Sequence, residues 1–476
     1  MEEKAMNIRI FQNYPSVDEK KLDQLLQREI EINSVKIIVL DDDPTGVQTV
    51  HDVSVYTDWS KESIREGMME KNKLFYILTN SRGLTKDQTI HVHQTIGKNI
   101  AELSKAMEIP CLVISRSDST LRGHYPTETQ ILKDTLEAEG YPEIDGEIIC
   151  PFFQEGGRFT IDDVHYILDG QQLIPVGETE FAKDQTFGYH SSNLKEYVEE
   201  KTDGIYPKDQ VISISLNSLR NIDLNTITEQ LINVTNFNKI IVNAFEYCDL
   251  KVFCIALYRA MKRGKLFMFR TAASFVKVMG GVSDIPLLTK NQLLHKKSNT
   301  GGIVVVGSHT KKTTAQLKEL LTLECVVGIP FHSHLVSAGD HIFSREIQRV
   351  IHESEDVMRQ GKTAVCYTDR KLLTVKNETK EESLIRSVKI SDGVQALIGK
   401  LSITPSFVIA KGGITSSDVG TKALKVRRAD VLGQIKPGVP VWRTGKESRF
   451  PQIPYIIFPG NVGGTETLKE VVEILL

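Results

Sequence analysis

Lys36-Ile37-Ile38-Val39-Leu40-Asp41-Asp42-Asp43-Pro44-Thr45-Gly46 is the stretch that decides the fold class of this 476-residue chain. A short apolar run of strand length ends directly in three carboxylates and a turn. Further runs of this kind follow, several of them separated by amphipathic stretches such as Lys86–Met107. They are Val53–Tyr56, Leu74–Leu78, Cys111–Ile114, Glu147–Cys150, Val211–Ile214, Lys239–Val242 and Leu266–Phe269. Buried strands that alternate with helices predict an α/β fold with a largely parallel sheet.

The same alternation continues to the C-terminus and predicts two lobes. Ser16, with Glu19 three residues on, predicts the N-cap of an opening helix. The polar segment 295–302 ends in two glycines and precedes a new strand-like run, Ile303–Val306. We therefore expect domains at 1–294 and 303–476, a linker at 295–302, and a cleft between two α/β lobes with largely parallel sheets.

Composition excludes several classes of protein. The chain is 40% hydrophobic and 25% charged, with 58 Lys+Arg against 61 Asp+Glu, so no global basic field attracts nucleic acid or a membrane surface. No apolar run approaches the roughly 18 residues that a membrane span needs. The six cysteines are dispersed, several within apolar runs, which predicts buried thiols and a cytoplasmic location.

Arginines and hydroxyls follow the strands of the first lobe, where parallel sheets bind their ligands. Leu74–Leu78 leads to Arg82, Cys111–Ile114 leads to 115–123, and Leu266–Phe269 leads to Arg270. Such groups hold a carboxylate or phosphate by charge-assisted hydrogen bonds, although a single one would more simply be a surface salt bridge. Loops 152–158 and 181–184 are candidates for the rim. The triple carboxylate at 41–43 is either a solvated acidic turn or a site whose repulsion a ligand or a basic group relieves.

The strand ends of the second lobe carry glycine and hydroxyl residues instead. Gly307-Ser308-His309-Thr310, Lys411–Ser416 and Pro459–Thr465 each follow a strand-like run. Such turns expose backbone N–H groups to a phosphate, so three of them favour a nucleotide site over plain turns. The P-loop, the Gly-x-Gly-x-x-Gly turn, the Gly-x-Ser-x-Gly elbow and Cys-x-x-Cys are all missing from the sequence.

Two His-x-His pairs, 91/93 and 332/334, are the candidates for a metal site. On a helix the i,i+2 spacing does not place both side chains on one face, and the sequence offers no third ligand nearby. We therefore expect no metal site from these histidines.

Together these motifs resemble the four-carbon acid sugar kinase family, from the first strand to the C-terminus. Asp118-Ser119-Thr120-Leu121-Arg122-Gly123 is the most specific element, joined by 42–46, Gly307-Ser308, 412–416 and 460–464. The resemblance implies an N-terminal lobe that binds an aldonate such as threonate or erythronate, and a C-terminal lobe that binds ATP. It also implies ATP and Mg²⁺ as cofactors, phosphorylation of a substrate hydroxyl, and a homodimer as one candidate assembly.

Site residues follow from the same resemblance, in combination with the strand ends. Asp42 and Asp43 are expected to contact the sugar hydroxyls, and Asp43 is our candidate for the general base. The acid-sugar pocket is expected to include Arg82, Arg116, Asp118, Ser119, Arg122, Arg158 and Arg270. The nucleotide is expected at Ser308, Gly412, Gly413, Ile414, Thr415, Gly460, Asn461 and Gly463.

Three positions depart from the common family pattern. Arg116 stands where lysine is frequent, Ile414 where an acidic residue is common, and Val462 where phenylalanine is usual. Loss of the acidic residue leaves the metal ligands of that lobe unassigned, so no metal-binding residue is predicted. Two other readings remain open: a non-kinase enzyme acting on acid sugars, and a two-lobed sensor that binds an anionic sugar metabolite without catalysis.

Overall fold

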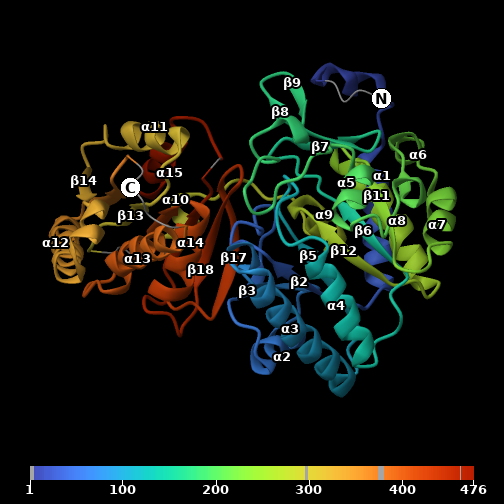
Figure 1. The fold of residues 1–476 in the computed structure, drawn as a ribbon, viewed down its shortest axis with the longest axis horizontal. Coiled ribbons are helices and arrows are strands. Elements are labelled where there is room, and N and C mark those ends of the chain that lie inside the picture. Colours follow the sequence, from blue (N-terminus) through green and yellow to red (C-terminus); the bar gives the residue numbers. More distant parts are fainter. Residues whose placement is uncertain (1–4, 295–298, 372, 374–379, 461) are drawn as a thin grey trace. The chain divides into compact units, whose positions relative to one another are not determined.

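The computed structural model describes residues 5–294, 299–371, 373, 380–460 and 462–476 (Figure 1). The chain divides into two compact units, one of Met1–Gly46 and Asp58–Asp284, the other of Val47–Thr57 and Ile285–Leu476. Each unit is an α/β domain with a mostly parallel sheet, so the predicted fold class is confirmed. Among the described helices, none is both long enough and apolar enough to cross a membrane.

The first unit is built on a parallel sheet with the strand order β10-β11-β6-β12-β5-β2-β4. Its strands are β2 (Lys36–Asp41), β4 (Leu74–Leu78), β5 (Cys111–Arg116), β6 (Gly146–Cys150), β10 (Ile212–Ile214), β11 (Asn238–Val242) and β12 (Phe267–Thr271). Because β2 lies between β4 and β5, the carboxylates after β2 lie between the ends of two other strands. Val39 and its neighbours in β2 are fully buried, which explains the continuous apolar run in the sequence.

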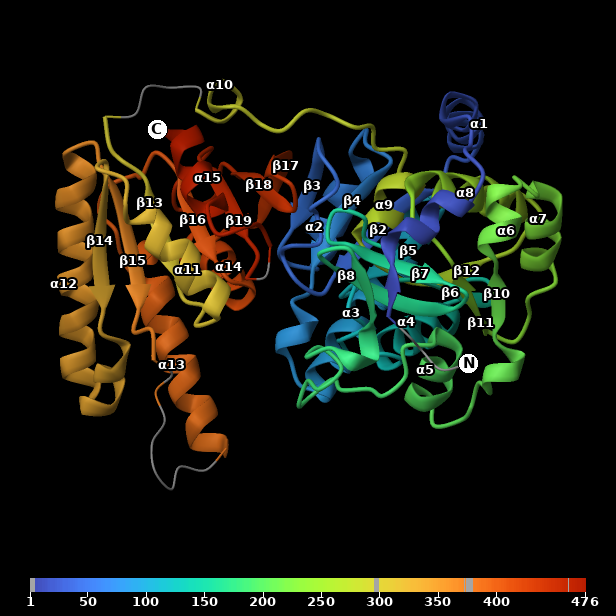
Figure 2. The same cartoon turned by 90° about the horizontal axis from the view of Figure 1, so that it is seen from above.

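Helices cover both faces of this sheet. They are α1 (Glu19–Ile32), α2 (Lys61–Met69), α3 (Lys86–Met107), α4 (Thr127–Ala138), α5 (Leu194–Lys201), α6 (Leu216–Arg220), α7 (Leu224–Ile232), α8 (Tyr247–Lys262) and α9 (Ala273–Met279). α2, α3 and α4 pack together, and α1, α7 and α9 pack on α8. Figures 1 and 2 both show the sheet between these two groups. The connections from β2 and β5 therefore leave loops at one sheet edge, where ligands of such sheets bind.

A second, small sheet in this unit lies outside the sequence prediction. β1 (Met6–Asn7), β9 (Gln172–Pro175), β8 (Val164–Asp169) and β7 (Arg158–Ile161) form it in that order, and every pair is antiparallel. Strands this short carry too few alternating residues to be distinguished from loops. The sheet matters because it places Arg158 and His165 beside the loop that follows β5.

The second unit contains the order β3-β17-β18-β19-β16-β13-β15-β14. Its strands are β3 (Val53–Tyr56), β13 (Ile303–Val306), β14 (Val326–Phe331), β15 (Thr363–Thr368), β16 (Val408–Lys411), β17 (Arg428–Lys436), β18 (Val439–Thr444) and β19 (Pro454–Phe458). The last five strands in the order, from β19 to β14, are parallel. The helices are α10 (Lys290–Leu293), α11 (Lys311–Leu320), α12 (Asp340–Arg359), α13 (Lys380–Gly399), α14 (Gly413–Asp418) and α15 (Thr467–Leu475).

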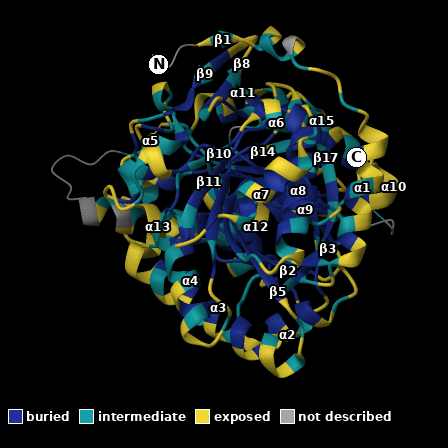
Figure 3. Ribbon diagram, turned by 90° about the vertical axis from the view of Figure 1, so that its right-hand side faces the viewer, coloured by how far each residue is buried: buried dark blue, intermediate teal, exposed yellow. Residues whose placement is uncertain are grey.

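Burial follows the layers in both units. Figure 3 shows strands that are almost entirely buried, while most exposed residues lie on helices and loops. In the second unit, Val304, Ile409 and Ile456 from three neighbouring strands pack in one apolar core with residues of α11 and α15. All six cysteines are free, five of them buried, as their apolar sequence context predicts.

Three details differ from the sequence-based expectation. The N-cap of α1 is Asp18, whose carboxylate accepts from the Lys21 N–H, so the prediction of Ser16 was wrong. β3 is grouped with the second unit because it pairs with β17. The division also differs from the predicted boundaries at 294 and 303, since Leu288 and Leu293 belong to the core of the second unit. Residues 295–298 of the predicted linker lie outside the described residues.

Candidate functional site

The three carboxylates at the end of β2, Asp41 to Asp43, meet arginines from the neighbouring strand ends. Asp41 is paired in register with Arg116 at the end of β5, and the two side chains form a buried ion pair. Arg116 also donates to the Asp43 carbonyl over 2.7 Å. A Cβ at Gly46 would overlap the Arg116 guanidinium, so any other residue at this turn would displace Arg116 from its present position. Arg116 therefore neutralises and shapes the acidic turn.

Arg82 connects the acidic turn to the loop after β5. Its guanidinium forms ion pairs with Asp42 and Asp43, both at 3.1 Å, and with Asp118 at 3.6 Å. Arg122 in turn contacts Asp118 at 2.7 Å. Because Arg116 also lies 3.3 Å from Asp42, the structure brings six predicted residues of the sugar site together in one network of opposite charges.

The three adjacent aspartates have different electrostatic environments. Burial raises the pKa of Asp41 to about 7 although Arg116 opposes it. Burial also raises the pKa of Asp42, against Arg82 and Arg116. At Asp43 burial acts in the same direction, but Arg82 and Arg116 outweigh it, so the pKa is lowered. Asp42 Oδ2 is buried and has no hydrogen-bond partner among the described residues.

The loop 118–123 is held from behind by buried side chains. Arg270, 2% exposed, donates to the carbonyls of Leu121 and Arg122 over 3.1 and 3.2 Å. The His165 Nε2 lies 2.8 Å from the Ser119 carbonyl oxygen, and burial lowers the pKa of His165 to about 4. A neutral imidazole can donate this one bond without placing a charge in the core. Arg270 therefore positions the loop, and a direct contact with substrate stays a prediction for it.

Arg158 is a half-buried arginine near the ring of Phe181. Its guanidinium donates to the Gly156 carbonyl and lies 5.9 Å from the ring centre of Phe181, while that of Arg122 lies 4.9 Å from the same ring. Within the described residues Arg158 forms no ion pair, and burial lowers its pKa, opposed by Asp118. Two arginines on one aromatic ring, one of them unpaired, are suited to bind an anion.

The sequence analysis missed a buried hydrogen bond behind this network. The Ser81 hydroxyl donates to Glu128 Oε1 over 2.5 Å, and both residues are buried. The His93 Nε2 lies 4.0 Å from the same carboxylate. Glu128 sits near the start of α4 in an ordinary amphipathic pattern, so no signal in the sequence marks it.

In the second unit, three predicted turns lie side by side. β16 is flanked by β13 and β19, so the turns after Val306, Lys411 and Phe458 are neighbours. Gly412 has φ +120°, and a Cβ there would lie 3.3 Å from the Ser308 Cβ. Only glycine adopts this backbone readily. A Cβ at Gly460 would lie 3.9 Å from Ser308 Oγ, so the three turns meet around Ser308.

The remaining predicted nucleotide residues have different surroundings. Thr415 lies against Gly307, where an added Cβ would overlap its hydroxyl. Gly413 begins α14, and Ile414 beside it is 74% exposed. Gly463 has φ +79° next to Thr467. Asn461 lies outside the described residues.

Two cations near these turns were not singled out from the sequence. Lys411 is fully buried, and its Nζ donates to the carbonyls of Pro459 and Gly460 over 2.5 and 3.3 Å. Burial lowers its pKa to about 7, and Lys312 adds to the effect. Arg370 donates to the Ser308 carbonyl and to Thr314 Oγ1. Neither cation forms an ion pair with a residue that the structure describes, so no described carboxylate neutralises the positive charge of either side chain.

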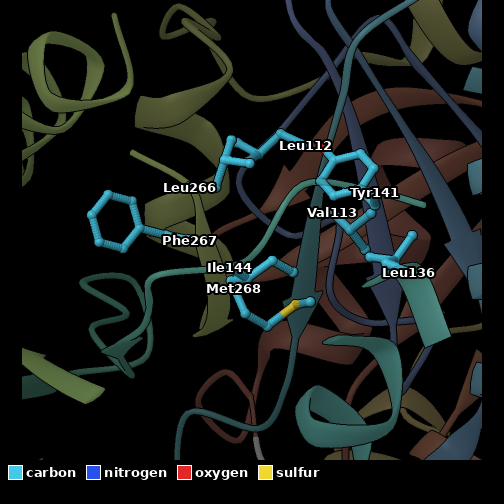
Figure 4. Close-up of a pocket in the computed structure, with 8 residues that line it drawn as sticks. All are labelled: Leu112, Val113, Leu136, Tyr141, Ile144, Leu266, Phe267 and Met268. Carbon is cyan, nitrogen blue, oxygen red and sulfur yellow. The ribbon is translucent and has the colours of Figure 1, made fainter. Parts of the chain in front are cut away.

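An apolar pocket at the other edge of the first sheet carries no such chemistry. Leu112 and Val113 of β5 and the start of β12 line it, together with helix and loop residues (Figure 4). These residues lie at the amino ends of their strands, away from the edge that carries the aspartates. The pocket offers no charged side chain and is not the candidate site.

Comparison with known families agrees with this division of chemistry. The family model of a sugar-binding N-terminal domain matches residues 37–279, and that of a nucleotide-binding C-terminal domain matches residues 303–468. The fold and the two sites thus define a protein with one sugar-binding and one nucleotide-binding domain. The chain belongs to the four-carbon acid sugar kinase family, and the resemblance seen in the sequence is confirmed.

Solved structures show the same fold at low sequence identity. Haemophilus influenzae protein HI1011, assigned to the family model DUF1537, is 16% identical with a TM-score of 0.60, and the match covers 92% of this chain and 100% of that one. A Salmonella typhimurium LT2 protein is 14% identical with a TM-score of 0.63, covering 91% and 98%. No curated protein matches the chain.

Proposed function

We propose that this protein is an ATP-dependent kinase that phosphorylates a hydroxyl of a four-carbon acid sugar such as threonate or erythronate. One observation carries the proposal: the sugar-binding domain holds both an acceptor and a cation that are suited to an acid sugar. Asp42 Oδ2 has no hydrogen-bond partner among the described residues, and Arg158 forms no ion pair with any of them. An acid sugar carries both a hydroxyl to be deprotonated and a carboxylate to be bound. The nucleotide-binding domain supplies the second substrate site.

The substrate carboxylate is proposed to bind Arg158 and Arg122. A planar guanidinium binds a carboxylate through two parallel hydrogen bonds, and the Phe181 ring limits where both groups can lie. Asp118, Ser119 and Arg82 then face the sugar hydroxyls.

Asp42 is proposed as the general base that accepts the proton of the attacking hydroxyl. Two observations support it over Asp43, our candidate from the sequence. The Asp42 Oδ2 has a free lone pair, and its raised pKa makes it the stronger proton acceptor. Asp43 accepts from the Thr45 N–H and pairs with Arg82, and its pKa is lowered.

ATP is proposed to bind where the three glycine turns meet. Backbone N–H groups at Ser308, Gly413–Thr415 and Gly460 would hold the phosphates, while the Gly412 N–H donates to the Phe458 carbonyl and shapes the turn. Lys411 and Arg370 would compensate the phosphate charge. Phosphoryl transfer needs little more from a protein than positioning and charge stabilisation. Mg²⁺, expected from the family, finds no carboxylate at Ile414, so we assign it no protein ligand. The free thiols support a reducing compartment such as the cytoplasm.

A coupled ADP-release assay across four-carbon hydroxy acids tests the proposal. We expect ADP formation with Mg-ATP and one of these acids, and none with ATP alone. Two alternatives make other predictions: a sensor would be thermally stabilised by the acid sugar without turnover, and a non-kinase enzyme would convert the acid without ATP. Absence of ADP with every acid, by a protein that binds ATP, would contradict the kinase.

A further inference from the structure

His332, His334 and Asp369 form a cluster at the carboxyl edge of the second sheet. The two histidines follow β14, and Asp369 follows β15, the strand paired with it in register up to Thr368. His334 Nδ1 lies 2.8 Å from Asp369 Oδ2, and His332 Nδ1 lies 3.8 Å from Asp369 Oδ1. One donor atom from each of the three residues lies within 4.8 Å of the other two.

We propose that His332, His334 and Asp369 bind a divalent transition-metal ion of the Zn²⁺ class. The sequence analysis rejected these histidines because the spacing is wrong for a helix and no third ligand is nearby in sequence. The structure changes both premises. His332 is the N-cap residue of a short 3₁₀ helix, Ser333–Ala338, which follows β14 and contains His334, so the spacing rule for an α-helix does not apply. The neighbouring strand supplies a carboxylate.

The donor set selects the class of ion. Mg²⁺ and Ca²⁺ prefer oxygen ligands, whereas two imidazoles with one carboxylate suit Zn²⁺ and its neighbours. Donor atoms around a tetrahedral Zn²⁺ with bonds of about 2.0–2.2 Å are about 3.4 Å apart, so the present spacing needs only small side-chain rotations. His332 and His334, 45% and 54% exposed, have room for them, and solvent could fill a fourth position.

The surroundings already orient these ligands. The Ser333 hydroxyl and the His334 N–H both donate to Asp369 Oδ2, over 3.1 and 2.9 Å. The His332 N–H donates to Glu346 Oε1 over 2.8 Å, and Arg349 holds that carboxylate. Partners of this kind fix metal ligands and raise the affinity of a site.

The cluster is next in sequence to a residue of the proposed nucleotide site. Asp369 directly precedes Arg370, whose guanidinium donates to the Ser308 carbonyl. A metal ion bound to Asp369 would restrict the motion of the backbone next to Arg370. The metal proposal rests on the cluster itself and does not depend on the proposed kinase activity.

Zn²⁺ binding to the full-length protein tests the site, by competition with a chromophoric chelator. We expect one Zn²⁺ per chain in the wild type, and a visible absorption spectrum of bound Co²⁺. Removal of an outer-shell partner typically costs 10- to 100-fold in metal affinity, so H334A and D369N should each lose at least about 100-fold. S333A, which removes one outer-shell donor, should lose about tenfold.

H352A is the matched control. His352 is exposed and lies 3.5 Å from Asp356, but this pair belongs to no three-residue ligand cluster among the residues that the structure describes. This variant should bind Zn²⁺ like the wild type. Equal affinity in wild type, H334A and D369N would overturn the proposal, as would failure of the wild type to bind a stoichiometric Zn²⁺ ion. Thermal melting of the metal-free proteins checks that each variant is folded.

Discussion

Asp42 and Asp43 are adjacent in sequence, yet their pKa values move in opposite directions. General-base catalysis contributes about 10²- to 10⁴-fold, so D42N should lower kcat by that factor. Because Asp42 also pairs with Arg82 at 3.1 Å, D42N should raise KM as well. D43N should mainly raise KM, because it weakens the contact that positions Arg82. Steady-state kinetics of both variants decide between them. A loss of kcat confined to D43N would assign the base to Asp43.

The pH dependence follows from the same assignment. A base works only when deprotonated, so kcat should fall as the pH drops through the raised pKa of Asp42. D42N should lack this acidic limb, whereas D43N should keep it.

Arg158 is the residue from which we expect the clearest effect on substrate binding. Hydrogen bonds to charged groups contribute about 1.5–3 kcal/mol, so R158A should raise KM for the acid sugar about 10- to 100-fold. The KM for ATP should not change. Arg259, an arginine paired with Glu29 on α1, provides the control R259A, which should leave both constants unchanged. If R158A kept the wild-type KM, the carboxylate would bind elsewhere.

From the lowered pKa of Lys411 we expect nucleotide binding to depend on pH. Its pKa is about 7 in the free protein, and a bound phosphate would raise it, so binding takes up a proton above that pH. ADP affinity should therefore fall as the pH rises from about 7 to 9, by at most tenfold per unit. K411M should bind ADP more weakly and without this dependence. Calorimetric titrations in buffers of different ionisation enthalpy measure the proton uptake, and none in the wild type would contradict the assignment.

The same lysine contributes a stability term of known sign. Unfolded Lys411 holds its proton up to the ordinary pKa of 10.5, whereas the folded residue releases it near 7. The unfolded state binds more protons between these values, so this contribution to the free energy of unfolding rises with pH across that window.

At the scale of elements, the turn from β16 into α14 depends on one glycine. G412A would force alanine to φ +120° and bring its Cβ to 3.3 Å from the Ser308 Cβ. Backbone strain of this kind costs about 1–3 kcal/mol, and here it distorts the turns proposed to bind phosphate. We expect G412A to weaken ADP binding by at least about tenfold. G361A, at φ +75° with open space around it, should lower stability without changing ADP affinity. Equal ADP affinity in both variants would argue against this turn as the phosphate site.

Strand ends were the predictable part of the structure, because buried parallel strands leave a continuous apolar run in the sequence. β2 and the carboxylates after it follow directly from that pattern. The sequence could not predict which charged side chains meet. The ion pairs of Arg82 depend on which strands are neighbours in the sheet, and no local sequence pattern gives that order. For the same reason Asp369 was missed as a partner of His334, 35 residues away.

At the scale of the molecule, the two units are not consecutive in the sequence, because β3 comes from the N-terminal half but belongs to the second unit. Residues 47–57 belong to the second unit, where Val53–Tyr56 pair with β17, and the chain returns to the first unit at Asp58. Two side-chain hydrogen bonds add to this strand pairing. Gln48 donates to the Gly438 carbonyl over 3.2 Å, and Arg428 donates to the Ser54 hydroxyl. The second unit therefore includes residues from the N-terminal half of the sequence.

Because β3 belongs to the second unit, we expect a fragment of residues 285–476 to lack one strand of its sheet. Without β3, the four residues of β17 that pair with it, Arg428–Val431, have an unpaired edge, which promotes association between chains. Hydrogen bonds contribute about 0.5–1.5 kcal/mol each, so the lost pairing should lower the free energy of unfolding by at least about 2 kcal/mol. The comparison is with the same fragment carrying residues 47–57 on a flexible linker. Urea unfolding and size-exclusion chromatography should show the bare fragment less stable and more associated. Equal stability and a monomeric bare fragment would mean that β3 contributes little to the second unit.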